Sequence, residues 1–262
     1  MKESGKTTAP AFYAWPAPAG AAAPLVSVVA PMLNEAGVAG ALVREVAAAL
    51  GDFEHEIVIV DDGSSDGTGD ALAAEKKEIP QLRVIRHGAA AGQSRAIRSG
   101  VLAARGAIIA MIDGDGQNDP KDIADLIARL RAADAGVAMV AGERVARADT
   151  SAKALASRIA NSVRKRLLKD AANDTGCGLK VFYREAYLRL PYFDHMHRYF
   201  PALMAREGFG VAFAPVSDRP RRHGASKYSN FGRLLVAIRD LAGVLWLLGR
   251  FRDPKSIEER LD

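Results

Sequence analysis

The sequence is almost without cysteine, because Cys177 is the single one among 262 residues. An intrachain disulfide requires two cysteines and a thiolate metal cluster requires several, so the chain can form neither by itself. A reducing compartment such as the cytoplasm fits this usage. Cys177 lies next to glycines and has no evident base partner, which favours a buried thiol over a nucleophile.

The sequence also lacks an apolar run of the about 20 residues that cross a bilayer. Its most apolar stretch, Leu234 to Phe251, is interrupted by Arg239 and Asp240. Flanking arginines and Trp246 favour an amphipathic helix in the headgroup region of a membrane. A helix packed on the domain or on a partner protein is the alternative. We therefore expect membrane-surface or partner-binding helices over residues 230–262.

The first 24 residues are rich in alanine, proline and glycine and contain no signal-peptide core. We expect a disordered leader over residues 1–24 and one domain over residues 25–229. The net charge of +5 favours anionic partners such as nucleotides, phospholipid headgroups or nucleic acid.

Positive charge is concentrated in residues 144–169, which hold eight basic side chains and a single acid, Asp149. The spacing predicts a helix whose buried stripe is formed by Leu155, Ile159, Val163 and Leu167. This segment has no aromatic side chain that could stack on a base, which argues against a nucleic-acid-binding module.

Short β-branched runs alternate with longer amphipathic runs through the first 140 residues, which predicts βα units. The fold class is therefore α/β, with a doubly wound and mostly parallel sheet. The expected strands are 25–30, 56–61, 82–86, 107–113 and 137–141, with helices beginning near residues 37, 66, 92 and 119. A further strand and helix are expected over 179–190, and a last strand over 210–214.

The residues that follow these strands are acidic or amide-rich. Asp113 and Asp115 lie two apart at a strand end, so that their carboxylates project to one side. This suits Mg²⁺ or Mn²⁺, which takes one or two carboxylates together with phosphates and water. A simple turn before a helix beginning at Asp119-Pro120 explains the same residues about as well.

Asp61 and Asp62 are adjacent at the end of another strand. In the segment 61–66, helix capping by Ser64 or Asp66 explains the last residues. It does not explain the adjacent aspartates, which repel each other unless a nucleotide's donor groups or a cation offsets their charge. Ala30 and Pro31 stand where a sugar nucleotidyltransferase would have a glycine-rich loop, which argues against that class.

Four motifs follow one another along the chain: PMLNE at 31–35, DDGSSD at 61–66, DGDGQNDP at 113–120 and GASKY at 224–228. Together they resemble family 2 glycosyltransferases, and specifically the dolichyl-phosphate mannose synthase group, over 25–228. The resemblance implies the GT-A fold, a Rossmann-like nucleotide-binding sheet. Gly114 stands where many relatives have alanine, a difference expected to matter little.

The resemblance also implies site residues. The nucleotide sugar would be bound by Pro31, Asn34, Glu35, Asp61, Asp62, Asp113, Gly114, Asp115, Arg219, Arg222 and Lys227. The metal would be held by Asp113, Asp115 and Gln117, and the acceptor phosphate by Arg144, Arg158, Ser162, Asp174 and His197. Asp115, Arg144, Arg158 and Lys227 would act in catalysis.

The implied reaction is metal-dependent, inverting transfer of a hexose from GDP-mannose or a UDP-hexose to polyprenyl phosphate. It would take place on the cytoplasmic face of a membrane, reached directly or through an integral membrane partner, and without nucleic acid. The alternative is a family 2 enzyme that acts on a carbohydrate hydroxyl, for which Asp174 is the candidate base.

Overall fold

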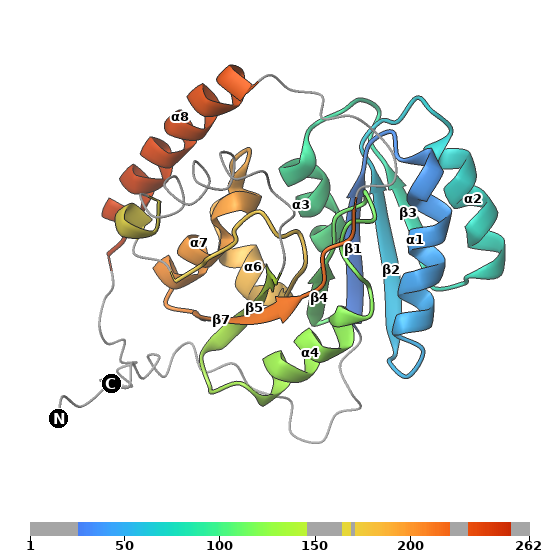
Figure 1. The fold of residues 1–262 in the computed structure, drawn as a ribbon, viewed down its shortest axis with the longest axis horizontal. Helices are drawn as coiled ribbons and strands as arrows, with labels where there is room; N and C mark the ends of the chain where they lie inside the picture. The colour runs from blue at the N-terminus through green and yellow to red at the C-terminus, as the bar shows by residue number, and fades with distance from the viewer. Residues whose placement is uncertain (1–25, 146–163, 169–170, 221–229, 253–262) are drawn as a thin grey trace, which may run out of the picture.

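The computed structural model describes residues 26–145, 164–168, 171–220 and 230–252 (Figure 1). The expected leader, most of the basic helix and the GASKY motif lie outside these residues. Among the expected site residues, the same is true of Arg158, Ser162, Arg222 and Lys227.

A seven-stranded sheet forms the centre of the molecule, with strand order β3-β2-β1-β4-β6-β5-β7. The strand β6 runs antiparallel to its neighbours β4 and β5, and the other pairs are parallel, so the mostly parallel sheet is confirmed. The strands are β1 (Val26–Met32), β2 (His55–Asp61), β3 (Leu82–Arg86), β4 (Ile108–Met111), β5 (Val137–Arg144), β6 (Lys180–Tyr183) and β7 (Gly210–Val216).

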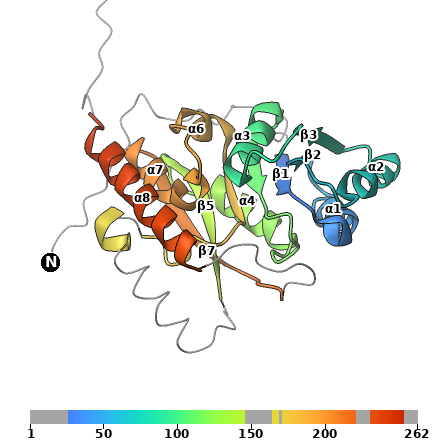
Figure 2. The same ribbon diagram turned by 90° about the horizontal axis from the view of Figure 1, so that it is seen from above.

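Helices cover both faces of this sheet (Figures 1 and 2). Side chains alternate along β1, so that Val28 packs with the core under α1, α2 and α4, whereas Val29 packs with the core under α3, α6 and α7. The helices are α1 (Ala36–Ala49), α2 (Thr68–Glu78), α3 (Gln93–Ala103), α4 (Asp122–Ala132), α6 (Arg184–Arg189), α7 (Phe200–Arg206) and α8 (Asn230–Gly249), with a 3-10 turn, η2, over Met196–Tyr199.

The strand order reverses between β1 and β4, which are neighbours in the sheet although two strands separate them along the chain. Ligands of doubly wound sheets bind beyond the carboxyl ends of the strands at such a point. The PMLNE motif begins with the last two residues of β1 and continues beyond it, and the DGDGQNDP motif follows β4. The topology therefore brings these two motifs to the position where a ligand is expected.

The expected stripe of the basic helix is wrong at its last member. Residues 164–168 are helical, but Leu167 is 44% exposed and Leu168 is 6% exposed. Leu168 packs into the core that contains α3, α6 and α7. The helix therefore buries Leu168 instead of Leu167, because contact with this core decides which face of the helix points inward.

The helix α8 lies against the same core. Val244 is buried, and Leu241, Leu245 and Leu248 pack around it. None of the helices in the described parts of the chain has the length and apolar character needed to cross a membrane. One side of α8 thus packs on the domain.

A buried carboxylate ties the amino-terminal ends of the first strands together. Glu56 accepts hydrogen bonds from Ser27 Oγ (2.6 Å), the Arg105 N–H (2.6 Å) and Arg83 Nη1 (2.5 Å). Burial by itself would raise the pKa of Glu56, but these hydrogen bonds and the Arg83 charge lower it below the usual 4.5.

We expect Glu56→Gln to lower the free energy of unfolding by about 2–4 kcal/mol at pH 7, because Arg83 loses its buried partner. A carboxylate whose pKa is lowered by folding stabilises the protein above the unfolded pKa and loses this effect as the pH falls. Urea titrations should therefore show a difference between wild type and variant that is constant from pH 7 to about pH 5 and shrinks as the pH falls below 4.5. A pH-independent difference would contradict the assignment.

Candidate active site

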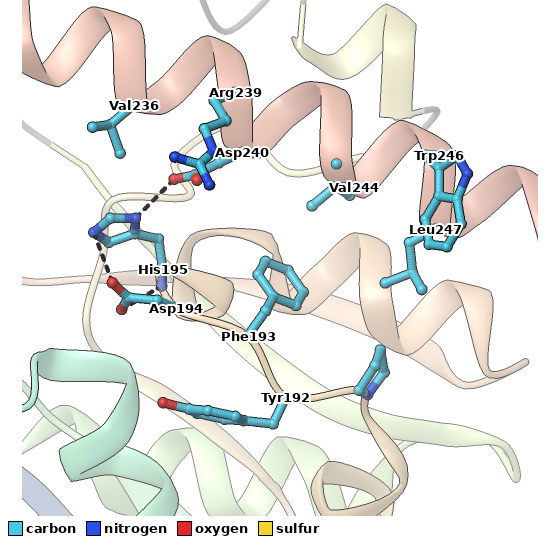
Figure 3. A pocket seen from close by; sticks show the side chains of 12 residues that line it. Tyr192, Phe193, Asp194, His195, Val236, Arg239, Asp240, Val244, Trp246 and Leu247 are labelled. Carbon is cyan, nitrogen blue, oxygen red and sulfur yellow. Dashed lines mark hydrogen bonds and ion pairs between the residues drawn. The ribbon is translucent and has the colours of Figure 1, made fainter.

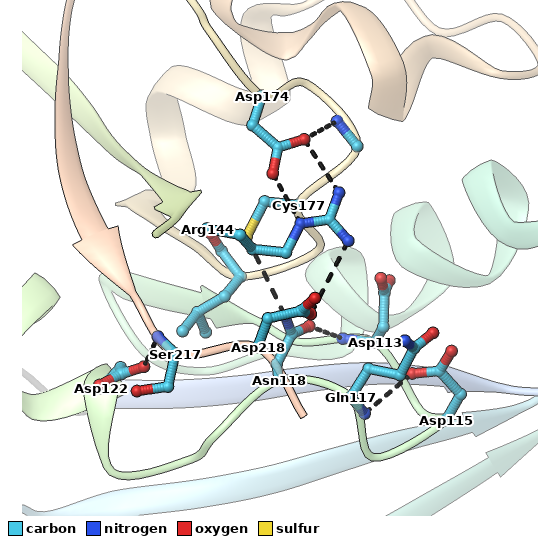
Figure 4. A network of polar contacts seen from close by, with 12 residues as sticks. Asp113, Asp115, Gln117, Asn118, Asp122, Arg144, Asp174, Cys177, Ser217 and Asp218 are labelled. Atoms are coloured by element: carbon cyan, nitrogen blue, oxygen red, sulfur yellow. Dashed lines mark hydrogen bonds and ion pairs between the residues drawn. The ribbon is translucent and has the colours of Figure 1, made fainter. Parts of the chain in front are cut away.

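The loop after β4 carries the two carboxylates expected to hold a cation, Asp113 and Asp115, which are neighbours in Figure 4. Asp113 accepts a hydrogen bond from Gln93 Nε2 (2.9 Å), and Asp115 accepts one from the Gln117 N–H (3.1 Å). Burial and the charge of Asp115 raise the pKa of Asp113 to about 6. A bound cation would remove this conflict between like charges.

These carboxylates fit a metal that is completed by its substrate better than a closed protein site. Among the described residues, no group of three or more His, Cys, Asp or Glu side chains is arranged to hold a metal. Mg²⁺ and Mn²⁺ are commonly bound by one or two carboxylates and substrate phosphates. Asp113 and Asp115 are therefore suited to a cation that arrives together with a diphosphate.

Two glycines let the chain approach these aspartates closely. A Cβ on Gly178 would lie 2.1 Å from the Asp113 carboxylate, and a Cβ on Gly114 would lie 2.4 Å from the Pro31 carbonyl oxygen. An alanine at position 114 would require this loop to move, because the contact is with backbone. That the glycine matters little beside the alanine of relatives stays a prediction. The Pro31 carbonyl group thus packs directly against Gly114.

The segment after β7 is joined to the loop that carries Asp115. The Arg219 N–H donates to the Gln117 carbonyl oxygen (2.8 Å), and Asn118 forms an antiparallel bridge with Asp218. The Arg219 guanidinium contacts Asp119 (2.7 Å) and also Glu45 on α1. Arg219 therefore lies at the site, but its charge is balanced by two carboxylates.

Asp62 is held by donors of the protein. It accepts hydrogen bonds from the N–H groups of Ala91 (2.9 Å) and Gly92 (2.8 Å), and His87 Nδ1 lies 2.7 Å away. Asp61 accepts one from the Ser64 N–H (2.8 Å). Both aspartates are buried. Donors of the fold thus satisfy Asp62, whereas Asp61 Oδ2 is buried without a hydrogen-bond partner and has Arg86 Nε 3.6 Å away. Contact of the two aspartates with a nucleotide stays a prediction.

The PMLNE motif is fixed to the DDGSSD motif by side-chain and backbone hydrogen bonds. Asn34 has a left-handed backbone with φ of 56°, and its Oδ1 accepts from the Ser65 N–H (2.8 Å). The Glu35 N–H donates to Thr68 Oγ1 (2.9 Å), and Asp66 bonds the next N–H. Asp66 therefore links two loops, in addition to bonding the Thr68 N–H at the start of α2.

Arg144, at the end of β5, is bound by a forked ion pair (Figure 4). Its Nε and Nη2 donate to the two oxygens of Asp174 (2.6 and 2.9 Å), and its Nη1 lies 3.8 Å from Asp218. These carboxylates raise the pKa of Arg144 further, so it stays cationic. Asp174 and Arg144 are thus brought together as expected, but as partners of each other.

His197 lies beside the first turn of α3. Its Nδ1 is 2.8 Å from Ser94 Oγ. Burial and the positive charges of Arg198 and Lys180 lower the pKa of His197 to about 3, so its imidazole is neutral at pH 7. It can offer a hydrogen bond to a phosphate, but no positive charge.

Lys180 is the main residue that the sequence analysis missed. It is 2% exposed, its Nζ donates to the Cys177 carbonyl oxygen, and its charge acts on Asp113. Gln93, Glu45 and Asp218 were missed as well. A lysine inside an apolar strand, KVFY at 180–183, was the available signal, because buried lysines require partners.

Cys177 is buried, and burial raises the pKa of its thiol. We expect iodoacetamide to label it at pH 8 at least about 100-fold more slowly in the native chain than in urea, because the thiolate is both scarce and covered. Mass spectrometry after timed quenching measures both rates. Rapid labelling of the folded chain would show that the thiol is accessible.

Comparisons with known proteins agree with this arrangement. The model of the family described as "Glycosyl transferase family 2" matches residues 27–190. A curated relative, dodecaprenyl-phosphate galacturonate synthase of Rhizobium johnstonii, is 33% identical over 232 residues, which cover 85% of this chain and 67% of the relative.

Solved structures show the same fold. Mannosyl-3-phosphoglycerate synthase from Rubrobacter xylanophilus has a TM-score of 0.66 and 20% identity, covering 88% of this chain and 78% of the other. Glucosyl-3-phosphoglycerate synthase from Mycobacterium tuberculosis, in complex with Mn²⁺, UDP-glucose and glycerol 3-phosphate, has a TM-score of 0.65 and 19% identity, covering 88% and 82%. The chain therefore belongs to glycosyl transferase family 2 and is a glycosyltransferase with the GT-A fold.

Proposed function

We propose that the chain transfers a sugar from a nucleotide diphosphate sugar to polyprenyl phosphate, with inversion at the anomeric carbon. The observation that carries this proposal is the pair Asp113 and Asp115 at the switch point of the sheet. Support for the acceptor comes from the relative named as a dodecaprenyl-phosphate galacturonate synthase. Support for the donor comes from fold neighbours that hold UDP-glucose or GDP-Man together with Mn²⁺.

A divalent cation bound by Asp113 and Asp115 would supply positive charge to the departing diphosphate. The chain's own residues have the task of positioning. Gln93 orients Asp113, and Gln117 orients Asp115 through its N–H. A lipid phosphate is ionised at neutral pH, so it can attack without a strong general base, and alignment becomes the main requirement.

The groups assigned to the two phosphates, some cationic and some neutral hydrogen-bond donors, come from several segments. Arg144 and His197 are the described members of the acceptor group, and Arg219 is the described member of the donor group. Arg158, Ser162, Arg222 and Lys227 complete the two groups in this proposal and stay predictions. Arginine suits both roles, because its forked donors match phosphate oxygens.

Transfer to a carbohydrate hydroxyl is the second candidate, and the contacts of Asp174 oppose it. A general base must have an oxygen that can take the proton of the hydroxyl. Both Asp174 oxygens accept hydrogen bonds from Arg144, and Oδ1 also accepts one from the Gly176 N–H (3.2 Å). Both oxygens of Asp174 are therefore already engaged by donors of the protein.

We also propose that the protein works at the cytoplasmic face of a membrane, with α8 at the lipid surface. Ile238 and Trp246 are 57% and 63% exposed and lie two turns apart on α8, with Ala242 between them. Arg250 and Arg252 follow at the end of the helix. An apolar stripe bordered by arginines is typical of helices that lie in the headgroup region.

The direct test is to incubate the protein with Mn²⁺, undecaprenyl phosphate and a panel of radiolabelled donors that includes GDP-mannose, UDP-glucose and UDP-galacturonic acid. We expect label in the organic phase with one donor and none after addition of EDTA. Label transferred instead to a water-soluble glycan would favour the carbohydrate-hydroxyl reaction. Failure with every donor and this acceptor would overturn the proposal.

A further inference from the structure

A groove of about 620 Å³ runs between α8 and the segment before η2 (Figure 3). It is separate from the loop that carries Asp113 and Asp115, and nothing in the proposed chemistry uses it. Its volume lies within the range of roughly 300–1,000 Å³ that is usual for small-molecule sites. The groove is thus large enough for an organic ligand of moderate size.

The two ends of this groove differ in polarity. Asp194, His195, Arg239 and Asp240 gather at one end, where His195 Nδ1 lies 2.9 Å from Asp240 Oδ2. Phe193, Val244, Trp246 and Leu247 lie toward the other end (Figure 3). A ligand that matches this wall has a polar head and an apolar tail.

The polar end adjoins the candidate active site through three consecutive residues at the start of α3. Gln93 donates to Asp113 (2.9 Å), Ser94 Oγ lies 2.8 Å from His197 Nδ1, and the Arg95 guanidinium lies 4.4 Å from the centre of the Tyr192 ring. Tyr192 lines the groove. A Cβ on Gly92, next to Gln93, would lie 3.6 Å from Oδ1 of Asp194, which belongs to the polar end. The start of α3 therefore lies between the aspartates and the polar end of the groove.

The apolar end is placed to meet a bilayer. Trp246 belongs both to the wall of the groove and to the exposed stripe of α8. Tyr192, at 37% exposed, also lies along the groove, whereas Val236, at 39% exposed, lies near its polar end (Figure 3). A lipid lying beside α8 could enter the groove without crossing a polar surface.

We propose that this groove holds the isoprenoid units of the acceptor that are nearest to its phosphate. The phosphate lies beside the first turn of α3, and the remainder of the tail leaves past Trp246 into the membrane. This inference rests on the proposed polyprenyl phosphate acceptor and extends it to a binding site for the tail. The groove thereby selects acceptors by the presence of a long apolar chain.

The test compares geranyl phosphate with undecaprenyl phosphate in one detergent, using the ratio of their kcat/KM values. Wild type should prefer the long acceptor. Gly243→Phe fills the groove, because Gly243 lines it and a Cβ there meets nothing within 4 Å. The ratio should fall by about tenfold, as expected when ~60 Å² of apolar contact is displaced, while turnover of geranyl phosphate is retained.

Gly249→Phe is the matched control, because a Cβ there also meets nothing within 4 Å but Gly249 does not line the groove. It should leave the ratio unchanged. Three results would overturn the assignment of the lipid tail to the groove and leave the proposed function intact. They are an unchanged ratio in Gly243→Phe, an equal loss of kcat/KM on both acceptors, and no preference for the long acceptor in wild type. No transfer by wild type to either acceptor would overturn the proposed function, and the groove with it.

A second copy or a membrane protein could occupy the groove instead. Light scattering of the detergent-free chain distinguishes the first case, because Gly243→Phe would then change the oligomeric state and leave the acceptor ratio as in wild type. If a helix of a membrane protein occupied the groove, the ratio of kcat/KM values for the two acceptors in Gly243→Phe would likewise stay as in wild type. Either result would overturn the lipid assignment.

Discussion

Replacing Asp115 by asparagine is expected to lower sugar transfer by about three orders of magnitude, since removing a group that stabilises charge in the transition state has effects of this size. The loss should appear in kcat, and the Mn²⁺ concentration needed for half-maximal rate should rise. Activity measured over a Mn²⁺ titration gives both quantities. The melting temperature should change little, because the Asp115 carboxylate bonds a neighbouring N–H within its own loop.

Asp125→Asn is the matched control for this experiment. Asp125 is half exposed on α4, where it pairs with Arg129 four residues later, so an equal charge change there should leave transfer and metal requirement as in wild type. Near-normal transfer by Asp115→Asn would remove Asp115 from the mechanism. An equal loss in both variants would point to net charge rather than to a metal site.

The sequence was sufficient for the architecture, because burial patterns and turn residues are local signals. Continuous apolar runs such as 57–60 predict strands that are buried on both faces, and the intervening amphipathic segments predict the crossovers. What could not be read was the insertion of β6 between β4 and β5 in the opposite direction. Pairing between strands distant along the chain depends on packing of the whole sheet, and no residue in 180–183 encodes it by itself.

The candidate site was predicted in composition but not in its connections. Asp113 and Asp115 lie at the switch point, as their spacing after a strand suggested. The partners of Asp62 and Arg144 were not legible, since Ala91 donates through its backbone and Asp174 lies 30 residues away along the chain. Hydrogen-bond geometry of this kind depends on the final positions of loops.

The conflict over Arg144 is the point at which the structure changes the prediction most. The sequence resemblance assigns Arg144 to the acceptor phosphate, whereas its guanidinium is already forked to Asp174 and faces Asp218. A phosphate could replace the more distant Asp218, because the 3.8 Å contact is too long for a hydrogen bond. Asp174 would then keep Arg144 in place, and Arg144 would present its remaining donors to the acceptor.

This arrangement predicts that Arg144→Lys lowers kcat/KM for undecaprenyl phosphate by about 100-fold, because lysine keeps the charge but has no fork with which to contact Asp174 and a phosphate together. The KM for the donor should stay near that of wild type. Steady-state kinetics with each substrate varied in turn separate the two effects, and Arg129→Lys on α4 serves as an exposed control. If both substrates were affected equally and the melting temperature fell, Arg144 would be a structural partner of Asp174. Weakened use of the acceptor alone would place its guanidinium at the lipid phosphate.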